Sequence, residues 1–387
     1  MSKVFQSMKQ VLPLSALCLG LGAITLGCQP AETSQEKVTS VDHSPVKRQS
    51  IGNCWLYAHA TWLESMLKST TGETTNVSET YWTYWDLYHK LLANQPIPEE
   101  ELNTGGTWSR SRSIISTYGW VKEEDFIPEE SGMTMSKAQK CAQEHIMEQG
   151  KEGGTLFDVS TRTPELIRAE LDKGFSCNGL YTFDMNAAYE KRHLAADTRL
   201  VDVKTKEEQS LSTWLGRWRE ISTSAGNAYG PYEGKKLPTE SEMSRYKAIE
   251  QRIKRALNDH QPVVLSWFVS FNAASPKGLF NLSTLASKGE IGDSGGHMVV
   301  LHDYAVTDVP GRGRIGEGDL SEEDKALALD GDLDYLVVKN SWGADRADRP
   351  WLGDGYSRIS WDYLTGRYEN EDRFSTFIRG VVLPPGY

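Results

Sequence analysis

Three things are missing from this chain: an excess of basic residues, a long apolar run beyond its amino-terminal segment, and cysteines at metal-binding spacing. Of its 387 residues, 42 are Lys or Arg and 53 are Asp or Glu, giving a formal net charge of −11. Such a charge disfavours binding to nucleic acid and broad contact with anionic membrane surfaces. Beyond residue 28 no apolar stretch is long enough to predict a membrane-spanning helix. The remaining composition, 39% hydrophobic and 25% charged, predicts a globular protein with a sizeable core.

Cysteine is also scarce, and the positions of the five cysteines exclude the common zinc motifs. No Cys-x-x-Cys pair and no Cys/His set at ligand spacing occurs, so we expect no metal and no cofactor. Cys18 and Cys28 lie in the amino-terminal segment, and Cys54 precedes an apolar pattern of helical spacing. Cys141 and Cys177 can either pair in an oxidising compartment or be buried separately.

The first 27 residues have the features of a secretory signal. Lys3 and Lys9 precede a mostly apolar run from Val11 to Leu26, which is short for a membrane span. The run ends in Ile-Thr-Leu-Gly-Cys28, which resembles the lipobox of bacterial lipoproteins, in which the cysteine is lipidated and becomes the first residue. A plain signal peptide cut nearby is the alternative.

The residues after Cys28 predict where the chain is anchored and how. Gln29 is not the Asp typical of retention in the inner membrane, so we expect a lipid anchor in the outer membrane, or else a periplasmic or secreted protein. Residues 28–47 are rich in Ser, Thr, Glu, Gln and Lys, which suits a flexible tether. The folded domain is therefore expected over residues 48–387.

Hydrophobic periodicity predicts helices in the first part of the chain and strands in the last part. Helices are expected at about 54–67, 78–92, 110–118, 136–150, 164–173 and 240–258. Strands are expected at 262–269, 298–301, 335–339, 356–360 and 375–383. This order predicts an α+β protein with a helical lobe and a sheet lobe. Two charged segments interrupt it, an insertion at about 186–240 and an acidic loop at about 305–333.

Three short segments carry residues that could act together in catalysis. Gln49-Ser-Ile-Gly-Asn-Cys54-Trp places a thiol at the start of a helix, where backbone amides favour a thiolate. Gly295-Gly-His297 offers an imidazole as base. Lys339-Asn340-Ser-Trp342-Gly offers an amide oxygen that can orient the ring. The three segments together predict a nucleophilic cysteine.

These segments resemble the papain-like cysteine peptidases. The likeness extends to Trp351-Leu-Gly-Asp-Gly-Tyr-Ser-Arg-Ile359 and to Thr104-Gly105-Gly106-Thr-Trp, which is similar to the substrate-binding loop of the family. Tyr81-Trp-Thr-Tyr-Trp-Asp86 is most similar to the bleomycin hydrolase and aminopeptidase C branch. The resemblance implies a two-lobed papain-like fold, with a helical lobe carrying the cysteine and an antiparallel β-barrel-like lobe carrying the histidine and asparagine.

The resemblance also implies a role for each site residue. Cys54 and His297 would form a thiolate–imidazolium pair, Asn340 would hold the imidazole ring, and Trp342 would shield the bond between them. Backbone groups of Gly105 and Gly106 would pair with an extended substrate. A glutamine side chain would complete the oxyanion hole.

Two spacings depart from the family. The family glutamine lies six residues before the cysteine, where this chain has Arg48, so Gln49 could serve only after a one-residue deletion. His297 follows Cys54 by 243 residues, against about 130–150 in papain-like enzymes, which implies a large insertion.

The predicted function is hydrolysis of peptide bonds in a peptide or protein substrate by an exported, lipid-anchored cysteine peptidase. Endopeptidase and aminopeptidase action stay open, because the sequence does not reveal whether the tail Leu383–Tyr387 reaches the site. One alternative is an envelope amidase that acts on peptidoglycan peptides, and another is a non-catalytic peptide-binding lipoprotein. His302 and Asp303 are a rival pair for the site, with a structural role as the preferred interpretation.

Overall fold

The computed structural model describes residues 44–387 except 94, 223–239, 367 and 371–372. The predicted signal, the lipidation site Cys28 and most of the predicted tether lie outside the described residues. None of the described helices has the length and apolar content that a membrane span requires. Everything below concerns the unit that begins at Glu36.

The first part of the described chain is helical. It contains α1 (Cys54–Thr71), α2 (Glu79–Leu92), α3 (Trp108–Tyr118), α4 (Glu123–Phe126), η1 (Pro128–Glu130), α5 (Lys137–Gln149), η2 (Val159–Thr161), α6 (Pro164–Phe175) and α7 (Met185–Glu190). Local signals explain the boundaries. Ser78 accepts the N–H of Tyr81 at 3.2 Å to cap α2, and Gly119 ends α3 with φ 71°.

The last part of the chain is dominated by strands. Between the two parts lie β1 (Arg199–Val201), β2 (Glu208–Ser210), α8 (Leu211–Arg217) and β3 (Arg219–Ser222). The last part contains α9 (Glu240–Asn258), β4 (Val263–Ser270), η3 (Phe271–Ala273), β5 (Leu279–Phe280), α10 (Leu282–Lys288), β6 (Ser294–Val309), β7 (Gly313–Ile315), α11 (Glu322–Asp330), β8 (Asp332–Lys339), η4 (Pro350–Leu352), β9 (Tyr356–Ser360), α12 (Trp361–Thr365), β10 (Tyr368–Asn370), β11 (Arg373–Ser375) and β12 (Ile378–Leu383). The mixed α and β composition predicted from the sequence is confirmed.

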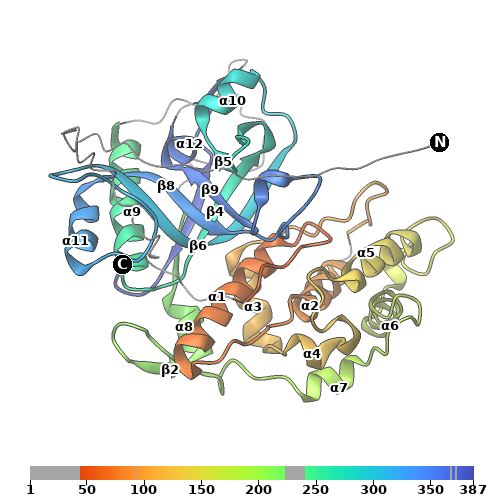
Figure 1. Cartoon of the computed structure of the whole chain (residues 1–387). Coiled ribbons are helices and arrows are strands. Elements are labelled where there is room, and N and C mark those ends of the chain that lie inside the picture. Colours follow the sequence, from red (N-terminus) through yellow and green to blue (C-terminus); the bar gives the residue numbers. More distant parts are fainter. Residues whose placement is uncertain (1–43, 94, 223–239, 367, 371–372) are drawn as a thin grey trace, which may run out of the picture. The chain divides into compact units, whose positions relative to one another are not determined.

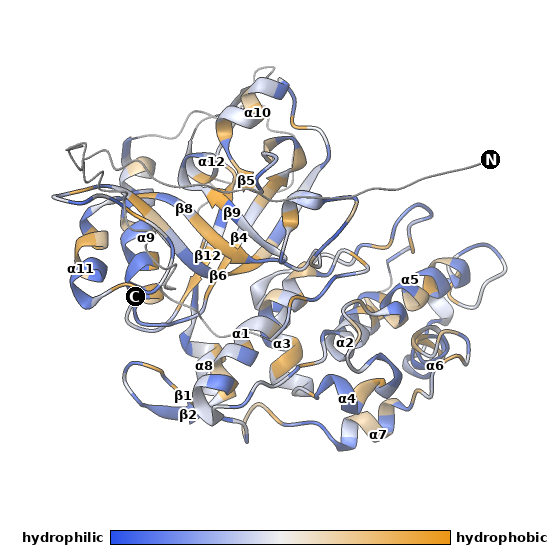
Figure 2. Cartoon of the chain, in the orientation of Figure 1, coloured by the Kyte–Doolittle hydropathy of each residue, from blue (hydrophilic) through white to orange (hydrophobic). Residues whose placement is uncertain are grey.

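An eight-stranded sheet organises the second part, in the order β3-β12-β4-β6-β8-β9-β5 with β7 paired to β6. The pairs are antiparallel except β5 with β9, which is parallel. Alternate residues of the central strands face two different hydrophobic cores, as the period of two in a strand requires. One core contains α1 and the other contains α9, and Figure 2 shows apolar residues along β4, β6 and β12. Helix α1 therefore packs directly on the sheet, mainly against β6.

Two segments that looked irregular in the sequence contain helices and strands among the described residues, and residues 223–239 of the predicted insertion lie outside the described residues. The predicted acidic loop at 305–333 is instead the end of β6, strand β7 and helix α11, which Ser321 caps by accepting the N–H of Asp324 at 3.1 Å. The predicted insertion contains β3, which pairs with β12 at the edge of the sheet. Trp218, next to β3, packs edge-on against Trp62 of α1 with ring centroids 5.2 Å apart. Pairing with β12 and the packing of Trp218, which have no local sequence pattern, stabilise the described part of the insertion.

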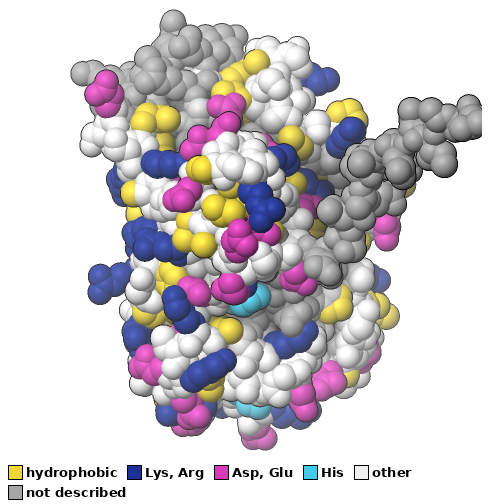
Figure 3. Space-filling view, turned by 60° about the vertical axis from the view of Figure 1, so that its left-hand side comes forward, with side chains coloured by type: hydrophobic (Ala, Val, Ile, Leu, Met, Phe, Trp, Pro, Cys, Tyr) yellow, Lys and Arg dark blue, Asp and Glu magenta, His cyan; other side chains and the backbone are white. Residues whose placement is uncertain are grey.

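Charge on the surface is mixed. On the face shown in Figure 3, Lys and Arg side chains are interspersed with Asp and Glu side chains. The described part of this face therefore presents alternating rather than single-sign charge.

Cys141 of α5 and Cys177, the second residue after α6, form a disulfide. The sequence left pairing and separate burial open, and the structure shows pairing. The bond closes a segment with a sequence separation of 36 residues, so it restricts the unfolded chain.

We expect the double substitution Cys141→Ser/Cys177→Ser to lower the free energy of unfolding by about 2–4 kcal/mol, because the unfolded chain regains the entropy that the bond removes. Urea unfolding of the oxidised protein and the variant measures this difference. Wild-type protein treated with reductant should behave like the variant. Alkylation of both thiols without reductant would contradict the expectation.

Candidate active site

Cys54 is the first residue of α1, and its thiol is buried at the amino end of the helix. The preceding residue, Asn53, does not cap the helix, because its side-chain amide donates to Thr83 Oγ1 at 2.8 Å. Cys54 is 8% exposed. Desolvation raises the pKa of the thiol to about 11, although backbone N–H groups of Met298, Trp55 and Cys54 itself lower it. Burial therefore outweighs the helix terminus, and the thiol is protonated at neutral pH.

His297 lies on β6, one residue before the Met298 amide that contacts the thiol. Its Nε2 and the Oδ1 of Asn340 are 2.8 Å apart. Because the amide oxygen can only accept, Nε2 donates, and Nδ1 is the ring nitrogen with a free lone pair. Desolvation lowers the pKa of His297 to about 4; the bond to Asn340 raises this pKa and the charge of Arg349 lowers it. The ring is therefore a neutral base.

Asn340 follows the last residue of β8 and is held on both sides of its amide group. Its Oδ1 also accepts the N–H of Ser341 at 2.9 Å, and its Nδ2 donates to Ser357 Oγ on β9 at 3.2 Å. Trp342 stacks on the His297 ring, with centroids 4.5 Å apart and planes 18° from parallel. The indole covers the ring beside the Nε2–Asn340 bond, so the ring is fixed in both position and tilt.

The neutral state of the two reacting groups differs from the ion pair that the resemblance implied. A thiolate or an imidazolium formed alone in this buried site would lose its hydration, which is why both pKa values move toward the neutral forms. Transfer of one proton from the sulfur to Nδ1 creates both charges at once, and each then stabilises the other. Burial therefore favours the neutral forms of both groups in the free protein.

Cys54 and His297 line one pocket with a volume of about 710 Å³, and Gly105 and Gly106 line it as well. The glycine loop is built onto the start of α1. Trp55 Nε1 donates to the carbonyl of Thr104 at 2.9 Å, and a Cβ on Gly106 would lie 2.3 Å from the Trp55 ring. Only glycine permits this approach of the loop to the indole. The loop and the first turn of α1, which carries Cys54 and Trp55, thus form one wall of the pocket.

The two glycines of the loop differ in how their backbone groups are used. The N–H of Gly105 donates to Asn103 Oδ1 at 3.1 Å, and its carbonyl accepts from Lys90 Nζ at 2.8 Å. Among the described residues no hydrogen bond to the backbone of Gly106 is found. Of the two, Gly106 is therefore the one that can pair with a bound chain.

Gln49 lies close to the site but is turned away from the pocket. Its Nε2 donates to the carbonyl of Ile51 at 2.9 Å, and its Oε1 accepts from Ser341 Oγ at 2.6 Å. It is not among the residues that line the pocket with Cys54. An oxyanion role for Gln49 would require the side chain to leave the Ile51 carbonyl.

The rival pair His302 and Asp303 lies further along β6 and does not line the pocket. Asp303 accepts the N–H of Tyr304 at 2.7 Å and of Gly318 at 3.0 Å, which stabilises a bulge in the pairing of β6 with β8 and the loop before α11. The preferred structural interpretation of this pair agrees with these contacts.

The carboxyl-terminal tail lies away from the pocket. Tyr387 packs beside α9, where its hydroxyl donates to Asp259 and its carbonyl accepts from Arg252. The tail residues 385–387 line a different cavity, next to Lys204 and Arg255. In this structure the carboxyl terminus therefore leaves the site open.

Several residues that line the pocket could not be predicted from the sequence. Ser266 and Trp267 come from β4, Glu220 and Ser222 from β3, and Arg379 from β12. Their position depends on the pairing of strands far apart in the chain, and β3 falls in the predicted insertion, where no strand was expected.

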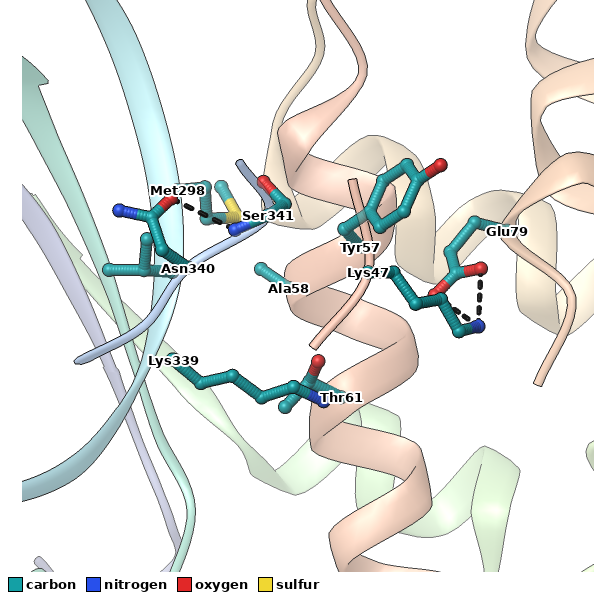
Figure 4. A pocket seen from close by; sticks show the side chains of 10 residues that line it. Lys47, Tyr57, Ala58, Thr61, Glu79, Met298, Lys339, Asn340 and Ser341 are labelled. Atoms are coloured by element: carbon teal, nitrogen blue, oxygen red, sulfur yellow. Dashed lines mark hydrogen bonds and ion pairs between the residues drawn. The ribbon is translucent and has the colours of Figure 1, made fainter. Parts of the chain in front are cut away.

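Beneath the site, a buried cluster of charges joins α1 to β8. Lys47 Nζ lies 2.7 Å from a Glu79 carboxyl oxygen and 3.8 Å from Glu64 on α1, and Lys339 Nζ lies 4.0 Å from Glu64. Ser44 bridges the last pair, because it donates to Glu64 and accepts from Lys339 at 3.0 Å. Figure 4 shows Lys339 reaching from β8 toward α1, with the Lys47–Glu79 pair near the same helix.

This charge cluster also orders the end of the predicted tether. Residues 44–47 are part of the folded unit, since Ser44 is buried and Lys47 contacts three carboxylates. Burial raises the pKa of the Glu123 carboxyl and lowers the pKa of the Lys339 ammonium, so it disfavours the charged form of each group. The cluster places charges of both signs between α1, which begins at Cys54, and β8, which ends at Lys339.

No family model matches the chain, and no curated protein sequence is similar to it. Solved structures with a similar arrangement exist at low identity. PepW from Lactobacillus rhamnosis HN001 is 15% identical, with 90% of this chain and 81% of that chain covered and a TM-score of 0.43. The chain is likewise similar to xylellain, a cysteine protease from Xylella fastidiosa, at 11% identity, with 92% and 88% of the two chains covered and a TM-score of 0.36.

Proposed function

We propose that this chain is a papain-like cysteine peptidase that hydrolyses peptide bonds through Cys54, His297 and Asn340. The observation that carries the proposal is the Nε2–Asn340 bond, which leaves Nδ1 of a shielded, neutral imidazole as the base beside a buried thiol. In this proposal the helical lobe supplies the cysteine, and an antiparallel β-barrel-like lobe supplies the histidine and asparagine.

The reaction we propose has two halves. His297 Nδ1 takes the proton of Cys54 as the sulfur attacks the peptide carbonyl, and the imidazolium then protonates the leaving amine to give a thioester. Water, deprotonated by the same Nδ1, hydrolyses the thioester and releases the acid. The Cys54 N–H would stabilise the oxyanion, and Gln49 would add a second donor if its side chain rotates, each worth roughly 3–4 kcal/mol.

Endopeptidase action is the form of this proposal that the open site supports. The tail ends at Tyr387 beside α9 rather than in the pocket, so it does not limit how much substrate extends past Cys54. Comparing peptides with free and acetylated amino termini tests this choice. Cleavage of the free peptides alone would establish aminopeptidase action instead.

We further propose that the protein is exported and lipid-anchored through Cys28, in the outer membrane of the cell envelope. The Cys141–Cys177 disulfide supports an oxidising compartment. Labelling of the intact protein with a fatty-acid analogue, lost on Cys28→Ser, is the expected result. A soluble, unlabelled wild-type protein would contradict the anchor.

Labelling by an epoxide thiol inhibitor, combined with peptide hydrolysis, tests the proposed chemistry. We expect one inhibitor per chain on Cys54 and loss of both labelling and hydrolysis in Cys54→Ala. The orientation of Gln49 favours one alternative, a peptide-binding protein without activity, and an unlabelled wild-type thiol would establish it. Release of peptidoglycan fragments that depends on Cys54 would instead point to an envelope amidase.

We expect Gly106→Ala to lower kcat/KM for peptides about 100-fold. The added methyl would meet the Trp55 ring at 2.3 Å, and Trp55 cannot yield because it is buried and bonded to Thr104. The displaced loop would then misalign substrate with Cys54. Gly216→Ala, where a Cβ meets nothing within 4 Å, is the matched control. Equal kcat/KM in both variants would exclude the loop from substrate alignment.

A further inference from the structure

Four paired strands place a row of residues beside the active-site pocket, and three of these four residues are small. Ser222 of β3 pairs with Gly380 of β12, Gly380 pairs with Ser266 of β4, and Ser266 pairs with Met298 of β6. Met298 is the residue whose N–H contacts the Cys54 thiol. The side chains of Ser222 and Ser266 are small and Gly380 has none, which leaves room along the strands that lead to Met298 and Cys54.

Glu220 extends over one end of this row. It lies two residues before Ser222 on β3, so both side chains are on the same face of the sheet. A Cβ on Gly380 would be 3.3 Å from Glu220 Oε1, which shows that the carboxylate lies across the glycine. Glu220 lines the same pocket as Cys54 and His297. The pocket therefore has a negative group within its walls.

The charges around Glu220 leave it available to a ligand. Among the described residues no ion pair or side-chain hydrogen bond to its carboxylate is found, and Arg112 is the basic residue whose charge acts on it. The other charged residue of the pocket, Arg379, donates to the carbonyls of Thr376 and Ile378 at 2.6 and 3.3 Å and lies over the Phe268 ring. Partial desolvation raises the pKa of Glu220, as expected for a carboxylate without a close partner.

We propose that Glu220 binds a cationic group of the substrate beside the carbonyl that Cys54 attacks. The cation is either the side chain of a lysine or arginine or the amino terminus of the substrate, since both pair with a carboxylate. This inference rests on the proposed peptidase function and names the substrate class of the same site. A neutral or acidic group in this position would leave Glu220 without a partner in a partly closed pocket, so the proposal predicts selection against such groups.

A matched peptide series tests the proposal. The peptides differ only at the residue that precedes the one whose carbonyl Cys54 attacks, which is Lys, Arg, Gln or Glu. Each peptide is made with a free and with an acetylated amino terminus. We expect wild-type kcat/KM to be about tenfold higher for peptides with a cation than for neutral ones. An advantage of acetylated Lys and Arg peptides assigns the cation to a side chain, and an advantage of free peptides regardless of residue assigns it to the amino terminus.

Variants at the same position distinguish a direct role from a general effect of charge. Glu220→Gln should bring the ratio of kcat/KM for cationic and neutral peptides close to one, and Glu220→Lys should favour the Glu peptide. Glu208→Gln, an exposed carboxylate on β2 that does not line the pocket, is the matched control and should keep the wild-type preference. Thermal unfolding checks that each variant is folded.

Two outcomes would overturn the inference, and they differ from failure of the proposed function. Cationic preference unchanged in Glu220→Gln would exclude Glu220, and a wild-type preference for Glu peptides would point to Arg379 instead. No hydrolysis of any peptide together with no labelling of Cys54 would overturn the peptidase proposal itself, and this inference with it.

Discussion

Replacing His297 with alanine should lower kcat/KM for peptide hydrolysis by about 10³–10⁴-fold. The thiol is buried, and desolvation keeps its pKa near 11, so without the imidazole nothing removes its proton at neutral pH. The helix terminus does not compensate, because its backbone amides already act on the sulfur and the pKa is raised nonetheless. Steady-state kinetics with the peptide cleaved best by wild type measures the loss.

The pH dependence of alkylation separates a chemical role of His297 from a structural one. In His297→Ala the rate of reaction of Cys54 with iodoacetamide should rise only above pH 9, because the thiol titrates above its ordinary pKa of 9.0. Wild type should react at lower pH, since Nδ1 can accept the proton as the sulfur attacks. A variant that reacts like wild type at pH 7 would show that the thiolate does not depend on His297.

The control for this substitution lies on the same strand. His302→Ala removes an imidazole five residues further along β6, in a position that does not line the pocket. It should keep most of the activity and the wild-type alkylation profile. Loss of activity in His302→Ala with full activity in His297→Ala would reverse the assignment of the base.

Replacing Glu64 with leucine should lower the free energy of unfolding by about 3–5 kcal/mol. Glu64 is 2% exposed, and its carboxylate accepts hydrogen bonds from the Ser44 hydroxyl and the Val77 N–H. The ammonium groups of Lys47 and Lys339 lie within 4.0 Å of it. Without Glu64 the buried Lys339 loses the carboxylate that favours its charged form, so it must either hold an unpaired charge or give up its proton, and both cost stability. Urea unfolding with global fitting measures the change.

A double-mutant cycle tests whether the loss comes from the stranded charge. Glu64→Leu/Lys339→Leu should be more stable than the sum of the two single changes predicts, because neither charge is then left buried alone. The exposed pair Arg199–Glu208 gives the comparison, and Glu208→Gln should change stability by less than about 1 kcal/mol. Additive effects of Glu64 and Lys339 would show that the two groups do not interact.

Much of the local structure could be predicted from the sequence, because the relevant signals are local. The helix that starts at Cys54, the Ser78 cap of α2 and the bounds of α9 follow from periodicity and capping residues. The strand run around residues 262–269 follows from continuous apolar composition. The sequence-based predictions failed where an element depends on pairing with a segment far away in the chain. Strand β3 forms because β12 pairs with it, and nothing in the residues around 219–222 indicates that strand.

The candidate site divides in the same way. Cys54, His297 and Asn340 stand in segments whose residue types indicate nucleophile, base and orienting amide, so the sequence by itself determined the chemistry to be expected. Only the tertiary structure decided the ionisation state, because burial of the thiol and the ring raises one pKa and lowers the other. It also decided the orientation of Gln49 and the presence of Glu220 in the pocket, since both result from contacts between segments far apart in the chain.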